Sequence, residues 1–274
     1  MSLLENLKEN KMIRRIYFLP HKFIWSYKDR VAERGAKKRK YGFIDKNFLE
    51  LYKLKQIYSG KRCFIVATGP SLRLSDIEML KDEITFGMNS ICNIFDKTDW
   101  RPTFYGIQDK FVYANMEDTI KKSLKDMKMV FVSDELDSIY DIPNSCVRFP
   151  FNPAYHLYDQ QIGKFYCKFS PDAYSIVYDG YSITYSLIQI AIYMGFKEIY
   201  LLGTDCNYKK NAKNHFVESG HYDKREYLNH DKMITGYQKL KEYADKQGIK
   251  IVNCTRGGML EIFQRKTIEE VLEL

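Results

Sequence analysis

Three histidines, His215, His221 and His230, fall within 16 residues of one polar segment, KKNAKNHFVESGHYDKREYLNHDK. Histidine accepts a proton near neutral pH, so each of the three is a candidate general base. The same cluster could bind a metal ion, but spacings of six and nine residues fit no familiar ligand pattern. A polar segment of this length, about residues 206–231, predicts a lid that orders over a bound ligand.

Small polar residues follow six apolar runs that are spread along the chain between residues 63 and 253. If these runs are parallel strands, their carboxyl ends meet at one edge of a sheet, which is where open α/β sheets bind ligands. The sequence therefore predicts a binding site built from strand-end residues. The residues in question are Thr68, Gly69, Pro70, Ser71, Asn89, Gln108, Asp109, Gly203, Asp205 and Thr255.

The loop Thr68–Ser71 has two interpretations. With one glycine it is not the GxGxxG loop of a dinucleotide site, and without GK[ST] it is not a P-loop. Ser75 and Glu78 form the pattern of a capping box, which predicts a helix that begins at about Ser75. The turn before that helix could direct backbone N–H groups and the Ser71 hydroxyl at an anion, or it could be a simple strand-to-helix turn.

The six apolar runs predict strands, and amphipathic stretches between several of them predict helices. One helix is expected from Ile183 to Met194, with Ser182 as N-cap and Gly195 as the stop, and another should end at Gly248. Alternating strands and helices predict an α/β fold: a Rossmann-like, doubly wound, mostly parallel sheet with a lid insertion. The expected strands are 63–67, 84–88, 103–107, 129–132, 198–202 and 249–253.

Length and composition bound the class of protein. The 274 residues suit one α/β domain with an elaboration, and an apolar content of 45% provides for a core. No run of about 18 apolar residues predicts a membrane span. The first residues lack the apolar core of a signal peptide, so we expect a cytoplasmic protein. Six scattered cysteines without a CxxC pair predict buried, reduced thiols.

The charge is concentrated at the N-terminus. Residues 1–60 hold 15 Lys/Arg against 6 Asp/Glu, a net +9, whereas the remainder holds 28 against 29. We therefore divide the chain into a basic, helical N-terminal extension (1–60) and a catalytic domain (61–274). Residues 11–40 interleave bulky apolar residues with cations, so the extension either contacts an anionic membrane at the inner face of the cell or packs on the main domain. No nucleic-acid-binding motif is present.

Four segments resemble a known family. IVATGPSL, FGMNSI, SITYSLIQIAIYMGFKEIYLLGTDCNY and GIKIVNCTRGGMLEIF resemble bacterial lipooligosaccharide sialyltransferases and the domain shared by motility-associated flagellin glycosyltransferases. The resemblance covers roughly residues 61–265. The same broad family includes an archaeal 6-hydroxymethylpterin diphosphokinase, so the resemblance leaves the reaction open.

The resemblance implies roles for individual residues. Residues of the Thr68–Ser71 loop would contact the nucleotide, although the sialyltransferases usually have Asn in place of Thr68, and Asn89 would touch the donor. Tyr208 matches a tyrosine that helps the phosphate leave, and His230 is the nearest match to the base, followed by His215 and then His221. The turn that supports the donor corresponds to Ser182, Ile183 and Thr184.

The implied activity is inverting transfer of an acidic sugar, sialic or a related nonulosonic acid, from a CMP donor to a glycan or lipid-linked glycan acceptor. A nucleoside monophosphate can leave without a metal ion, so no cofactor is expected. The chain contains no Asp-x-Asp pair of the kind that holds a metal in many glycosyltransferases. The alternatives are a pterin diphosphokinase that uses ATP and Mg²⁺, with Asp109 and Asp205 as candidate ligands, and a non-catalytic nucleotide-binding protein. A homo-oligomer is compatible with the sequence.

The region 149–181 is rich in aromatic residues. Aromatic faces stack on sugar rings, so this region could form an acceptor groove, or it could be a tyrosine-rich cap over the core.

Overall fold

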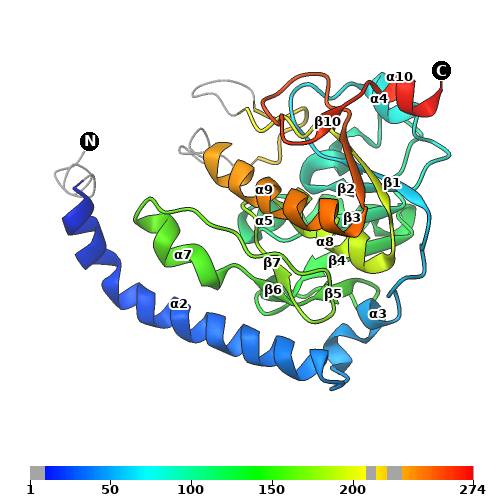
Figure 1. The fold of residues 1–274 in the computed structure, drawn as a ribbon. Coiled ribbons are helices and arrows are strands. Elements are labelled where there is room, and N and C mark those ends of the chain that lie inside the picture. Colours follow the sequence, from blue (N-terminus) through cyan, green and yellow to red (C-terminus); the bar gives the residue numbers. More distant parts are fainter. Residues whose placement is uncertain (1–9, 208–213, 221–229, 274) are drawn as a thin grey trace.

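A computed structural model describes residues 10–207, 214–220 and 230–273. Its centre is an eight-stranded sheet in the order β10-β9-β8-β1-β2-β3-β4-β5, and every pair of neighbouring strands is parallel (Figure 1). The predicted doubly wound α/β fold is confirmed. The strands are β1 (Arg62–Val66), β2 (Thr85–Met88), β3 (Phe104–Ile107), β4 (Met129–Ser133), β5 (Val147–Phe149), β8 (Glu198–Leu202), β9 (Lys250–Asn253) and β10 (Gln264–Arg265).

Alternate residues of the strands enter two separate cores. In β1, Cys63 and Ile65 face one cluster of buried side chains, and Phe64 and Val66 face the other. This period of two is the geometry of a strand buried on both faces, which is why the predicted strands read as continuous apolar runs. The helices and 3-10 turns around the sheet are α4 (Leu74–Glu78), η2 (Asn89–Ile94), α5 (Lys110–Ser123), η3 (Leu124–Asp126), α6 (Asp134–Asp137), α8 (Ile183–Met194), α9 (His230–Gln247) and α10 (Ile268–Leu272).

Helix α8 is the central helix of one layer. Ser182 caps it by accepting a hydrogen bond from Thr184 N, and Gly195 ends it in the left-handed conformation, as the sequence predicts. All twelve of its residues are buried, not only one stripe. The C-terminal part of α8 is covered by the end of α3 (Leu49–Tyr52), which follows η1 (Lys46–Phe48), and by the residues after it, where Tyr58 N donates to Met194 O.

A second, two-stranded parallel sheet pairs β6 (Phe151–Asn152) with β7 (Val177–Tyr178). Gln189 of α8 anchors it: its side-chain Oε1 accepts from Tyr178 N at 3.2 Å and its Nε2 donates to Tyr178 O at 2.8 Å. This small sheet and β5 were not predicted, because strands of two or three residues carry too few positions for a periodic pattern. Helix α7 (Ala154–Gln161) follows β6.

The predicted capping box at Ser75 is wrong. Helix α4 begins at Leu74 with Arg73 in the N-cap position, and no side chain caps it. Its first turn is held instead by Arg256, whose guanidinium donates to the Asp76 carboxylate at 2.7–3.0 Å. A true capping box occurs at the last helix, where Thr267 and Glu270 bond reciprocally to each other's backbone.

Two further predictions can be compared with the described residues. All six cysteines are buried and free, as expected for reduced thiols. The helix expected to end at Gly248 is α9, which ends at Gln247, and the glycine that follows has a φ of +62°. The lid expected at 206–231 lies partly outside the described residues, so it stays a prediction.

The basic extension contains α2 (Lys11–Lys40), a helix of 30 residues that packs against α7 along one side of the molecule (Figure 1). Near its C-terminal end Arg39 donates to Ser175 O at 2.8 and 3.1 Å. The extension is thus helical and packed on the main domain. Among the described helices, none is long and apolar enough to cross a bilayer.

Asp134, the first residue of α6 directly after β4, is a buried carboxyl group whose burial can be tested by pH. Its Oδ1 accepts from Phe151 N at 2.9 Å, and burial raises its pKa from 3.8 to about 6. Between these values the folded protein holds a proton that the unfolded chain releases, so the free energy of unfolding falls as the pH rises. We expect the fall in the free energy of unfolding between pH 4 and pH 7 to be smaller in Asp134→Asn than in the parent, by on the order of 2 kcal/mol. Urea unfolding at the two pH values measures it.

The control for this experiment is Asp82→Asn, which changes an exposed carboxylate. It should leave the pH dependence of unfolding as it is in the parent chain. Equal pH dependence in Asp134→Asn and in the parent would show that Asp134 is not desolvated.

Candidate active site

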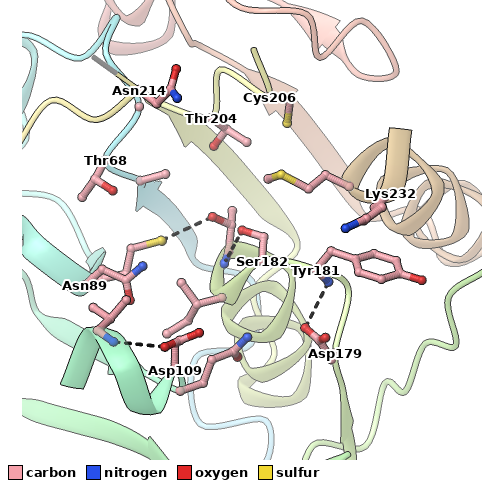
Figure 2. Close-up of a pocket in the computed structure, with 18 of the residues that line it drawn as sticks. Thr68, Asn89, Asp109, Asp179, Tyr181, Ser182, Thr204, Cys206, Asn214 and Lys232 are labelled. Carbon is pink, nitrogen blue, oxygen red and sulfur yellow. Dashed lines mark hydrogen bonds between the residues drawn. The ribbon is translucent and has the colours of Figure 1, made fainter. Parts of the chain in front are cut away.

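A cleft of about 920 Å³ opens at the carboxyl edge of the sheet. It lies where β1 is followed by β2 on one side and by β8 on the other, the switch point at which doubly wound sheets bind ligands. Figure 2 shows Thr68, Asn89, Asp109, Ser182 and Thr204 around the same hollow. Of the predicted site residues, those that line the cleft are Thr68, Gly69, Pro70, Asn89, Gln108, Asp109, Ser182, Ile183, Thr184, Gly203, Asp205, His215 and His230.

The loops after β1 and β8 cross at the floor of the cleft. Gly69 N donates to Gly203 O at 2.8 Å. A Cβ on Gly69 would lie 2.0 Å from Asp205 Oδ2 and 2.3 Å from Gly203 O, closer than any real contact. Gly203 has a φ of +61°, and a Cβ there would lie 2.6 Å from Ala67 O. Gly69 is therefore required by the contact between the two loops, whatever the cleft binds.

Asp205 braces this crossing. The Ser71 hydroxyl donates to Asp205 Oδ2 at 2.9 Å, and the Asp205 carbonyl accepts from Met259 N at 2.7 Å. Burial raises the pKa of Asp205, and the Ser71 hydrogen bond and the charge of Arg265 oppose that rise. Ser71 was expected to aim its hydroxyl at an anion; instead it donates that hydroxyl to Asp205 and is not among the lining residues.

Thr255 also lies behind the cleft. Its Oγ1 accepts from Thr204 N at 3.0 Å and so holds the end of β8. Its side chain lines a separate hollow of about 320 Å³, beside Arg256 and Lys266. Tyr208 and His221, also predicted for the site, lie outside the described residues.

Three buried polar atoms of the cleft have no hydrogen-bond partner within the described part of the chain. They are Asn89 Oδ1, Gln108 Oε1 and Thr204 Oγ1, and they follow β2, β3 and β8 respectively. Leaving such a group unpaired costs about 1–3 kcal/mol. Buried polar groups normally have partners, so three orphans in one hollow indicate a polar ligand.

The backbone of the cleft is locally strained. Asn89, Tyr181 and Cys206 have φ values of +48°, +65° and +50°, and all three line the cleft. They are three of the five non-glycine residues with positive φ in the described ranges. A left-handed backbone conformation at a residue other than glycine costs free energy and persists only where the surrounding structure imposes it. Such residues are found most often at functional sites.

Three helices begin at the rim of the cleft. Asp109 caps α5 by accepting from Phe111 N and Val112 N at 2.7 and 3.0 Å, Ser182 caps α8, and α9 begins at His230. Helix N-termini carry partial positive charge, and cationic side chains add to it. The cations of the lining are Arg14, Lys110 and Lys232. The lining also contains five carboxylates, so positive and negative groups both face the cleft: Asp109, Glu135, Asp179, Asp205 and Asp231.

His230 has a defined tautomer. Its Nδ1 lies 2.6 Å from Cys206 O, and a carbonyl oxygen can only accept, so Nδ1 carries the proton. In the neutral ring Nε2 then carries the lone pair. His230 lines the cleft and its side chain is 28% exposed, so this lone pair can act as a base. His215 also lines the cleft.

A buried histidine–aspartate pair lies beside the cleft and was missed by sequence reasoning. His156 is fully buried, its Nε2 lies 3.0 Å from Asp179 Oδ2, and its ring stacks on Tyr181 with centroids 4.3 Å apart. Asp179 Oδ1 accepts from Tyr181 N at 3.0 Å, the contact drawn in Figure 2. The pair holds the turn before Ser182. The signal available in the sequence was Asp179 itself, three residues before the N-cap.

Each interpretation of the aromatic region 149–181 holds for some of its residues. Tyr155, Tyr174 and Tyr178 are buried beneath the surface, as a cap over the core would be. Phe165 and Tyr181 line the cleft. The region therefore covers the core and also contributes aromatic surface to the cleft.

The fold and the cleft define an α/β protein with a polar cleft at the switch point of a parallel sheet. The chain belongs to the 6-hydroxymethylpterin diphosphokinase MptE-like family, whose model matches residues 40–211, more than half of the chain. The comparison with curated proteins found no match.

Solved structures share the fold. The MAf glycosyltransferase from Magnetospirillum magneticum AMB-1 matches 81% of this chain at 15% identity and a TM-score of 0.51, and the chain spans 38% of that protein's length. The sialyltransferase CstII from Campylobacter jejuni, solved with cytidine-5'-monophosphate, matches 76% of this chain and 85% of its own at 15% identity, with a TM-score of 0.47. At these identities the first match shows a glycosyltransferase-like fold.

The crossing of the two loops gives a direct test. We expect Gly69→Ala to lower the free energy of unfolding by about 2–4 kcal/mol, because the new methyl group overlaps Asp205 and the Gly203 carbonyl. The matched control is Gly257→Ala, where the nearest atom to a new Cβ is Ser71 Cβ at 3.8 Å. Urea denaturation measures both. Equal stabilities for the two variants would contradict the crossing.

Proposed function

We propose that the protein is a glycosyltransferase that moves an acidic sugar from a CMP donor to a glycan or lipid-linked glycan acceptor, with inversion and without a metal ion. The observation that carries the proposal is His230, whose Nδ1–H is committed to Cys206 O and whose Nε2 lone pair remains available at a cleft suited to an anion. The likeness of the Thr68–Ser71 loop and of the segment around α8 to sialyltransferase motifs supports the choice of donor.

The cleft offers separate groups to each part of such a donor. The phosphate would lie near the N-termini of α5 and α8, whose helix dipoles favour negative charge, and near the lining cations Lys110 and Lys232. The unpaired oxygens of Asn89, Gln108 and Thr204 would pair with the polar atoms of the nucleoside. Ligand binding would then satisfy groups that the protein alone leaves without partners.

The transfer step needs one base. Nε2 of His230 would take the proton of the acceptor hydroxyl, and the hydroxyl oxygen would attack the anomeric carbon on the face opposite the nucleotide. The bond from that carbon to the phosphate oxygen breaks, and CMP leaves with its electron pair. The imidazolium so formed is stabilised by Cys206 O and by the Asp231 carboxylate, 3.9 Å from Nε2. The role of Tyr208 stays an expectation from the resemblance.

Pyrophosphoryl transfer from ATP is the second candidate, and the family match favours it. It requires Mg²⁺ between the phosphates, held by carboxylates. Each candidate ligand already has a hydrogen-bond partner through one oxygen: Asp109 Oδ1 accepts from Phe111 N and Val112 N of α5, and Asp205 Oδ2 accepts from Ser71. In the described residues no three His, Cys, Asp or Glu side chains gather as a metal-binding group.

A thermal-shift panel of CMP, CDP, UDP, GDP and ATP, each with EDTA or Mg²⁺, separates the two candidates. We expect CMP to raise the melting temperature equally with EDTA and with Mg²⁺, because the cleft binds phosphate through helix N-termini and cations. A response confined to ATP with Mg²⁺ would favour the diphosphokinase and overturn the proposal.

Gln108→Leu tests whether CMP binds in the cleft. It removes a buried oxygen without a partner, so the free energy of unfolding should stay the same or rise by up to about 1 kcal/mol, while the shift caused by CMP should shrink. The exposed Gln264→Leu is the control and should change neither quantity. An undiminished CMP shift in Gln108→Leu would place the nucleotide elsewhere.

His230→Ala tests the base. We expect the turnover number for release of CMP from a CMP-activated acidic sugar, in the presence of acceptor, to fall by about 10²–10⁴-fold, because proton removal contributes that much. The CMP thermal shift should persist, because in the proposed mechanism Nε2 bonds to the acceptor hydroxyl and not to CMP. His21→Ala, an exposed histidine of α2, is the control. Full turnover in His230→Ala would exclude His230 as the base.

A further inference from the structure

Helix α2 is fixed to the domain along one side. Asp29 Oδ1 accepts from Asn152 Nδ2 at 3.0 Å, and Glu33 Oε1 accepts from Tyr178 OH at 2.9 Å and from Lys168 Nζ at 2.6 Å. Ala36 is buried against Tyr155 and Tyr178. These contacts recur at three- and four-residue intervals, so they define one face of the helix and fix its rotation about its own axis.

The opposite face of α2 is apolar and exposed. Met12, Ile16, Leu19, Phe23 and Tyr27 follow one another at intervals of three and four residues, so they share a stripe. Their exposed fractions are 72%, 64%, 47%, 68% and 65%, and the neighbouring Ile24 and Val31 are 54% and 48% exposed. At 1.5 Å per residue, the stripe from Met12 to Val31 is about 30 Å long. A contiguous apolar surface of this kind marks an interaction site.

All charges on the exposed side of α2 are positive. The helix contains eleven Lys/Arg and two acids, and the two acids, Asp29 and Glu33, are the residues drawn into contact with the domain. The exposed cations are Lys11, Arg15, Lys22, Lys28, Arg30, Arg34, Lys37, Lys38 and Lys40. Several of them continue the apolar stripe toward the C-terminal end of the helix, so apolar and basic surface lie end to end.

The positive charge of α2 favours one kind of partner for the exposed apolar stripe over another. A second copy of the chain would bring two strongly cationic helices together, and like charges across a contact are unfavourable. An anionic lipid surface pairs with the cations and receives the apolar side chains into the boundary between headgroups and acyl chains. We propose that α2 is a membrane-docking helix that lies in the plane of an anionic bilayer, with the stripe Met12–Val31 inserted.

The docking helix also reaches the cleft. Arg14 of α2 lines the cleft from the side of the helix that faces the domain, next to residues at the end of α7. The rim of the cleft is thus separated from the proposed lipid surface by about the diameter of one helix, 10–12 Å. A lipid-linked substrate in the bilayer would be presented to the cleft at this rim.

The test uses the full chain and measures flotation with vesicles of phosphatidylcholine alone or mixed with phosphatidylglycerol, without nucleotide. We expect binding to the mixed vesicles only, weakened by salt, and a loss of about tenfold or more in the partition coefficient for Ile16→Ser/Phe23→Ser. Arg30→Gln and Lys37→Gln should each cost about fivefold. The control Ile57→Ser/Ile139→Ser changes two residues that are 53% and 51% exposed elsewhere on the surface, and should bind as the parent does.

Two outcomes would overturn the proposal. One is the absence of binding to mixed vesicles, or equal binding to both vesicle types. The other is a dimer in sedimentation equilibrium that Ile16→Ser/Phe23→Ser converts to monomer, which would assign the stripe to a second copy. Neither measurement involves CMP, so failure here and failure of the proposed glycosyl transfer are distinguishable.

Discussion

The close approach of the loops after β1 and β8 is the constraint on which the site depends. Gly69 N bonds to Gly203 O, and the absence of a side chain at residue 69 leaves the space that Asp205 occupies. Asp205 in turn holds Ser71 and, through its carbonyl, Met259. A loop that resembles a phosphate cradle in sequence is therefore first a joint between two strands. Its function as a binding site follows from the joint, because the joint fixes the floor against which Asn89, Gln108 and Thr204 lie.

The cleft contains features that lower the stability of the folded protein. Three buried oxygens lack partners, and Asn89, Tyr181 and Cys206 hold left-handed backbone conformations. Each such feature costs on the order of 1–3 kcal/mol, and their concentration in one hollow has no structural benefit that would explain it. The surrounding structure offsets this cost: α8 is buried on every side, and Gln189 fastens the small sheet that precedes the turn at Asp179. A rigid helix thus supports a strained rim, as expected of a preorganised site.

The sequence predicted the elements that have a repeating or local pattern. It did not predict the features that depend on one contact between residues distant in the chain. Six strands and the caps of α8 could be predicted because apolar runs and the Ser182–Gly195 spacing are local signals. The start of α4 could not, because Arg256, 180 residues away, holds Asp76 there. For the same reason the partner of the Ser71 hydroxyl and the burial of His156 against Asp179 were missed: each depends on a residue distant in the chain. Most predicted strand-end residues do meet in one cleft, since parallel strands bring their carboxyl ends to one edge whatever the loops between them.

The two faces of α2 connect this site to the rest of the molecule. If the helix were only a structural extension, its acids and cations would be expected on the same solvated surface, where they could pair with each other at intervals of three or four residues. Instead Asp29 and Glu33 are directed to Asn152, Lys168 and Tyr178, and the exposed residues of α2 include no acid. That separation sets the orientation of the whole domain relative to any surface that the helix contacts. Arg14 belongs both to this helix and to the lining of the cleft that contains His230, so the proposed docking of α2 would turn this side of the cleft toward the bilayer.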